Sequence, residues 1–206
     1  MIKSMMIMIV ALNDDPIRIK AKDRSDLLLG LKRRGYELNN LFFKCNKNFY
    51  DIYAPFIGKL SDDPGKYVEW DFNNLREIYA ALPQNTVVPV AMVVSNDYGY
   101  VAGYLTEFIE GKTLKEVYTG ALAAMDQQLA VDYVRIVRGV EAAVNTLHEK
   151  GIAHGDISDT NIMVDADGTF KIIDPLRLKS MEISRKFDQE ALKELRRSAD
   201  HLDHLI

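Results

Sequence analysis

The sequence predicts an α+β fold with a β-rich first half and a helical second half, and three observations lead to this. Runs of β-branched and aromatic residues occur at 87–94 and 100–108, and a polar turn joins them. Apolar residues recur at alternating four- and three-residue spacing over 129–147, which is one face of a long buried helix. A further apolar stripe over 187–206 predicts a final helix.

The composition is that of an ordinary globular protein that can bury a core. The chain has 206 residues, of which 48% are apolar and 27% charged, enough for one domain or two small lobes. Its net charge of −4 provides no basic excess for neutralising phosphates, so no nucleic-acid partner is expected. The single Cys45 can form no internal disulfide, which favours a reducing compartment.

The apolar segment at 1–10 predicts a buried first strand rather than a targeting signal. It is shorter than the apolar region of a typical signal peptide, and no small-residue cleavage site follows it. No stretch reaches the roughly 18 apolar residues that a membrane span needs. We therefore expect a cytoplasmic protein with no membrane span. A specialised bacterial secretion signal would not be visible in this pattern, so secretion into a host cell stays open.

Two further elements are expected in the first half. The run Leu41–Lys44 follows an Asn-Asn pair that tolerates a tight turn, which indicates a strand. After a turn at 61–65, Asn73 and Asn74 are candidate N-caps for a short helix at 75–82, which Pro83 would end.

The run from His154 to Asn161 and the acid at Asp174 carry the chemistry. Asn161 lies five residues after Asp156, and Asp174 lies thirteen residues after Asn161. Glycine, aspartate, serine and asparagine also favour turns for backbone reasons, so a simple turn-rich loop is the alternative. The predicted elements around the run favour a functional site over a simple loop, because a long helix precedes the run and a hairpin at 164–169 separates Asn161 from Asp174.

These motifs resemble the catalytic and metal-binding loops of the protein-kinase-like superfamily in its His-Gly-Asp form. The resemblance implies a two-lobed fold, with a small β-rich lobe at 1–106 and a shortened helical lobe at 107–206. It implies ATP and Mg²⁺ as cofactors. Asp156 would orient the substrate hydroxyl, and Asn161 and Asp174 would be the Mg²⁺ ligands.

The segment 103–114 resembles the last strand of the small lobe running into the hinge between lobes. By this resemblance Thr106 is the gatekeeper, and the backbone of Glu107 and Ile109 hydrogen-bonds adenine. Glu77, on the short helix, occupies the place of the glutamate that pairs with a phosphate-binding lysine. A solvated helix face is the alternative for Glu77.

Two lysines compete for that pairing. Lys44 follows the expected hairpin, and upstream Gly30 and Gly35 have the spacing of the outer glycines of a phosphate loop, with Lys32 replacing the middle one. Lys59 has a more usual separation from Glu77 but no glycine loop at the usual distance before it. We favour Lys44, although either lysine could simply hold its ammonium group in water.

Departures from the family pattern narrow the expected function. Asp174 is followed by Pro175 and Leu176, no Ala-Pro-Glu triplet follows, and Gly155 replaces the arginine of His-Arg-Asp. Control by activation-loop phosphorylation is therefore not expected. Only 32 residues follow Asp174, which favours an open cleft over an enclosed small-molecule pocket.

The expected function is a minimal Ser/Thr protein kinase. The sequence resembles the Rio and Bud32 groups and the minimal kinases that some bacteria inject into host cells, and an activating partner is possible in such a reduced chain. Two rivals stay open. One is a small-molecule phosphotransferase similar to aminoglycoside or choline kinases, and the other is a pseudokinase that serves as a binding module.

Overall fold

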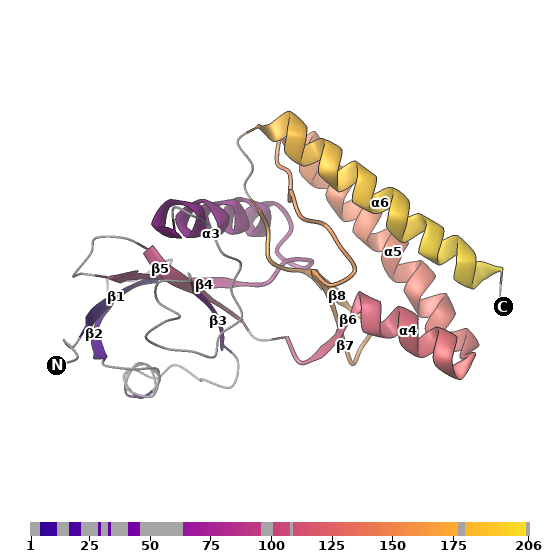
Figure 1. The fold of residues 1–206 in the computed structure, drawn as a ribbon, viewed down its shortest axis with the longest axis horizontal. Helices are drawn as coiled ribbons and strands as arrows, with labels where there is room; N and C mark the ends of the chain where they lie inside the picture. Colours follow the sequence, from indigo (N-terminus) through magenta and orange to yellow (C-terminus); the bar gives the residue numbers. More distant parts are fainter. Residues whose placement is uncertain are drawn as a thin grey trace. The chain divides into compact units, whose positions relative to one another are not determined.

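The computed structural model confirms the α+β prediction (Figure 1). The residues that it describes are 5–11, 17–21, 29, 33, 41–45, 64–95, 101–107, 109–176 and 180–204. Two compact units divide the chain: residues 1–73 with 88–108, and residues 74–87 with 109–206. The lobe limits of 1–106 and 107–206 stay a prediction, since the two units are interleaved in sequence.

The first unit contains a five-stranded antiparallel sheet in the order β2-β1-β4-β5-β3. Its strands are β1 (Met5–Ala11), β2 (Ile17–Ala21), β3 (Leu41–Cys45), β4 (Pro89–Ser95) and β5 (Val101–Glu107). The strands expected from the N-terminal run, from Leu41–Lys44 and from the two later β runs are thus present. On the pair β3–β5, Lys44 lies opposite Tyr104 and Phe42 opposite Thr106.

Helix α3 (Pro64–Ala81) is longer than the sequence predicted. The predicted start at Leu75 is wrong, because the helix begins within the segment 61–65 that was expected to be a turn. Proline suits the first helical position, where its fixed φ matches the helix and its missing N–H would have no partner. Asn74 is therefore an interior residue, and its Nδ2 donates to Ala153 O at 3.3 Å instead of capping the helix.

The second unit packs three helices with a small antiparallel sheet. The helices are α4 (Leu114–Ala124), α5 (Gln127–Glu149) and α6 (Met181–Asp203). The sheet has the order β6-β7-β8, from β6 (Gly111–Thr113), β7 (Ile162–Asp165) and β8 (Phe170–Ile172). The predicted hairpin between Asn161 and Asp174 is confirmed as the antiparallel pair β7–β8.

Helices α5 and α6 lie side by side and supply most of the core of this unit (Figure 1). The apolar faces predicted for the two helices are buried at all of their named positions except Leu129, which is half-buried: Tyr133, Val137, Val140, Val144 and Leu147 of α5, and Leu192, Leu195, Ala199 and Leu202 of α6. Helix α6 begins at Met181, earlier than the predicted residue 187, because Ser180 accepts from Ile183 N and caps it. None of the helices in the described part of the chain is long and apolar enough to cross a membrane.

Candidate active site

The loop between α5 and β7 brings Asp156 and Asn161 into direct contact. The Asn161 side-chain nitrogen donates to the Asp156 backbone oxygen at 2.8 Å and to its carboxylate Oδ2 at 3.1 Å. These two bonds determine which way the Asn161 amide faces, because only its nitrogen can donate. The Asn161 Oδ1 on the same amide is a hard oxygen donor of the kind that Mg²⁺ takes.

Asp174 lies at the end of the β7–β8 hairpin, next to this loop. The preceding residue, Ile173, donates its N–H to Asn161 O at 2.9 Å. Asp174 itself has φ 60°, the left-handed region that few residues other than glycine adopt. Such backbone strain is found most often at functional sites, where the surrounding structure maintains it.

His154 links the two loops through its imidazole. The Asp156 N–H donates to its Nδ1 at 3.3 Å, so we assign the ring proton to Nε2, which lies 3.1 Å from Ile173 O. The side chain is buried. The His154 imidazole therefore joins the backbone of Asp156 to the backbone of Ile173, the residue before Asp174, and so keeps the two segments close together.

Gly155 is required by the close approach of another segment. Its φ of +82° favours glycine, and a Cβ at this position would lie 2.1 Å from the backbone oxygen of Leu176. The Leu176 N–H in turn donates to His154 O at 3.0 Å. This glycine, at the place of the family's arginine, thus allows the chain after Asp174 to pack directly on the loop that carries Asp156.

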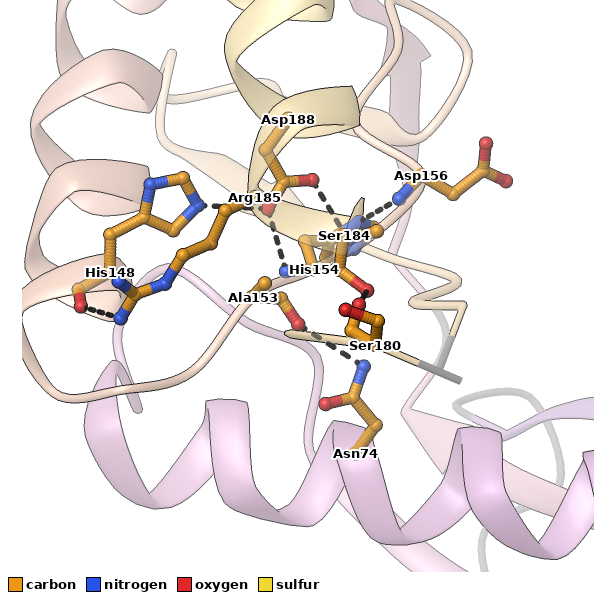
Figure 2. Close-up of polar contacts among 10 residues, drawn as sticks. Asn74, His148, Ala153, His154, Asp156, Ser180, Ser184, Arg185 and Asp188 are labelled. Carbon is orange, nitrogen blue, oxygen red and sulfur yellow. Dashed lines mark hydrogen bonds and ion pairs between the residues drawn. The ribbon is translucent and has the colours of Figure 1, made fainter. Parts of the chain in front are cut away.

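Asp188 of α6, which was not among the predicted residues, holds this loop in place. Its side chain is fully buried, and Figure 2 shows its carboxylate directed at the backbone of the loop. Oδ1 accepts from Gly155 N at 2.7 Å, and Oδ2 accepts from His154 N at 2.9 Å and lies 3.0 Å from His148 Nε2. One signal could have revealed it: Asp188 is an acid on the buried face of a predicted amphipathic helix, four residues before Leu192.

In the first unit, the predicted hinge residues engage one another. The Thr106 side chain is buried, and its hydroxyl donates to Glu107 O at 3.1 Å. The Glu107 N–H donates to Val88 O at 3.1 Å, and its carboxylate accepts from Val88 N at 3.0 Å. Adenine would therefore have to use the carbonyl of Glu107, which has two lone pairs, rather than its N–H. Ile109 is half-buried and belongs to the second unit.

The predicted phosphate-binding residues are only partly described. Glu77 is exposed on α3 and belongs to the second unit, whereas Lys44 lies on β3 of the first. Their pairing stays a prediction. Gly30, Lys32, Gly35 and Lys59 lie outside the described residues.

Asn161 and Asp174 are too few to enclose a metal ion by themselves, but they suit a cation that is also bound by the phosphates of a nucleotide. Among the described residues no cluster of three or more His, Cys, Asp or Glu side chains could hold a metal ion. Asn161 and Asp174 offer one amide and one carboxylate, which is the small number of protein ligands that Mg²⁺ takes when phosphate oxygens and water complete its octahedron.

A hollow of about 480 Å³ adjoins the loop between α5 and β7 within the second unit. The loop contributes Ile157, Ser158 and Asp159 to its wall, α4 contributes Tyr118, and α6 forms the opposite side. Its lining does not include Asp156. The volume lies within the range of small-ligand pockets, and the lining combines aromatic, hydroxyl and charged groups.

Comparison with known proteins places the chain in a family. The family model described as "Protein kinase domain" matches residues 70–188, more than half of the chain. The chain therefore belongs to the protein kinase domain family.

Three curated proteins are similar to parts of it. A probable serine/threonine-protein kinase of Clostridium perfringens is 30% identical over 101 residues, 48% of this chain and 14% of that protein. Two probable serine/threonine-protein kinases of Dictyostelium discoideum are 29% identical over 139 residues (66% of this chain, 20% of the relative) and 32% identical over 77 residues (37% and 11%). The chain thus spans a fifth or less of the length of these relatives.

Proposed function

We propose that this protein is an ATP- and Mg²⁺-dependent kinase that transfers the γ-phosphate to Ser or Thr of a protein substrate. The observation that carries the proposal is the direct contact of Asp156 with Asn161, together with the hydrogen bonds that join Ile173, the residue before Asp174, to Asn161 and His154. The names of the similar proteins support Ser/Thr specificity.

The roles of the three residues follow from their chemistry. Asp156 accepts the hydrogen bond of the attacking hydroxyl and receives its proton as the bond from the substrate oxygen to the γ-phosphorus forms, while the bond from that phosphorus to the β–γ bridging oxygen breaks and ADP leaves. Asn161 and Asp174 hold the divalent cation, which when bound neutralises charge on the transferring phosphate. His154 and Asp188 touch no reacting atom in this scheme; they hold the backbone from which Asp156 and Asp174 project.

Replacing Asp174 with asparagine tests the function. Asparagine keeps the size of the side chain and tolerates the left-handed conformation, so the fold should persist. Loss of the anionic metal ligand should lower phosphate transfer by at least about 100-fold. Transfer is measured with labelled ATP and a general protein substrate, and folding by circular dichroism.

Asp167→Asn is the matched control, since Asp167 is an exposed carboxylate in the β7–β8 turn. Full transfer by the Asp174 variant would refute the role of this residue. A thermal shift with ATP, with and without Mg²⁺, separates the kinase from a binding module: no nucleotide binding by the unmodified protein would favour the module.

The hollow beside the catalytic loop favours a second candidate function, a small-molecule phosphotransferase. Parallel assays with a protein substrate, an aminoglycoside and an amino alcohol distinguish the two. Phosphorylation of a small molecule and of no protein would select this second function.

A further inference from the structure

Asn161 is held at three points, and Ser158 supplies one of them. The Asn161 side-chain nitrogen donates to Asp156, and its backbone oxygen accepts from Ile173 N at 2.9 Å. The Asn161 backbone N–H has two acceptors, and both are on Ser158: the carbonyl oxygen at 3.1 Å and the side-chain Oγ at 3.2 Å. An N–H shared in this way forms a three-centre hydrogen bond. Ser158 therefore fixes the side of Asn161 that faces the loop.

The turn from Ser158 to Asn161 has further contacts of its own. Thr160 Oγ1 lies 3.0 Å from Ser158 Oγ. A serine hydroxyl has one proton and two lone pairs, so Oγ can accept from the Asn161 N–H and share a second hydrogen bond with Thr160. Lys115, in the first turn of α4, donates its N–H to Asp159 O at 3.0 Å. The hydroxyl of Ser158 is thus held in the rotamer in which it meets the Asn161 N–H.

This turn determines where the candidate metal ligand points. The Asn161 side-chain nitrogen faces Asp156, which leaves Oδ1 for a cation. Mg²⁺ requires nearly ideal octahedral geometry, so a small rotation of the Asn161 backbone would be costly for a bound ion. A side-chain hydrogen bond across a turn restrains such a rotation more than the backbone bond alone.

We propose that Ser158 is a positioning residue for the candidate metal ligand Asn161. Its hydroxyl fixes the Asn161 backbone, and Asn161 then presents Oδ1 in one direction. Ser158 touches no reacting atom in this role. The effect on the cation rests on the proposed function, whereas the effect on the Asn161 N–H does not.

Hydrogen exchange at the Asn161 amide tests the contact without any nucleotide. Ser158→Ala should raise the exchange rate of this N–H at least about fivefold, with unchanged rates in α5, because one of the two acceptors is lost. Ser158→Thr keeps the hydroxyl and should restore the slow rate. Thr119→Ala is the matched control, because Thr119 is exposed and its hydroxyl donates to the backbone of its own helix. An unchanged Asn161 rate in Ser158→Ala overturns the proposal.

Mn²⁺ binding tests the positioning role. The affinity of the protein for Mn²⁺ is measured by electron paramagnetic resonance with a non-hydrolysable ATP analogue present. Ser158→Ala should weaken it about tenfold, the low end for loss of a contact that orients a metal ligand, because the Ser158 carbonyl still accepts from Asn161. The Mg²⁺ concentration for half-maximal phosphate transfer should rise by the same factor, and Ser158→Thr should reverse both changes. Unchanged Mn²⁺ affinity in a folded Ser158→Ala variant overturns the positioning role.

A double variant shows whether the effect passes through the Ser158 hydroxyl. Thr160→Val alone should weaken Mn²⁺ binding by a smaller factor, about two- to threefold, because it frees the hydroxyl to rotate. In the Ser158→Ala background it should have no further effect, since the hydroxyl that it holds is gone. Additive losses would contradict this route.

The two measurements separate this inference from the proposed function. If the unmodified protein binds no Mn²⁺ and nucleotide, the proposed function fails and the role toward the cation fails with it. Faster exchange of the Asn161 N–H in Ser158→Ala would still establish that the hydroxyl restrains the Asn161 backbone.

Discussion

Replacing Asp188 with asparagine is expected to disrupt the catalytic loop and to lower the free energy of unfolding by about 2–4 kcal/mol. The carboxylate lies beside the N–H groups of His154 and Gly155 and Nε2 of His148 in a fully buried position. An asparagine side chain has one acceptor oxygen, and its NH₂ group would face a donor. At least one buried donor would lose its partner, and the backbone just before Asp156 would shift.

Urea unfolding monitored by circular dichroism measures the loss, and phosphate transfer should fall with it. Asp200→Asn serves as the control, because Asp200 is an exposed acid on the same helix. A variant at Asp188 with the stability and transfer rate of the unmodified protein would mean that the carboxylate does not hold the loop.

Replacing Gly155 with alanine should destabilise the protein by about 3 kcal/mol or more and inactivate it. Two effects add here. Alanine in the left-handed region costs about 1–2 kcal/mol, and the new Cβ would lie 2.1 Å from Leu176 O, a backbone atom that cannot move without loss of the Leu176–His154 hydrogen bond. Because this bond lies two residues after Asp174, its loss would displace the candidate metal ligand.

Gly151 offers a matched control that separates the two effects. It has nearly the same φ, +78°, but no atom lies within 4 Å of the place where its Cβ would be. Gly151→Ala should therefore show the backbone cost alone. Equal destabilisation in the two variants, measured by urea unfolding, would exclude the clash with Leu176. Gly155→Arg, which restores the His-Arg-Asp form, should be tolerated no better than alanine.

The roles of Asp156, Asn161 and Asp174 stay predictions that rest on short spacings along the chain, whereas the predicted hairpin between Asn161 and Asp174 is confirmed. The contacts that hold this candidate site could not be predicted in the same way. Asp188 lies 33 residues beyond Gly155, and its role depends on how α6 docks against α5. That docking is a tertiary event that a local pattern does not specify.

Helix α3 shows why the beginning of a helix is difficult to predict. The pair Pro64–Gly65 is as typical of a turn as of a first helical turn, so the helix was predicted too short and its first half was overlooked.

The position of Asp188 along the chain also affects the order of events during synthesis. A ribosome produces residues 154–174 before it produces the carboxylate that fastens them, and segments fold as their partners emerge. For a time the nascent chain therefore contains Asp156, Asn161 and Asp174 but not the Asp188 carboxylate. The loop can acquire the shape seen here only when α6 has emerged and packed on α5, so a partly synthesised chain should lack the folded candidate site.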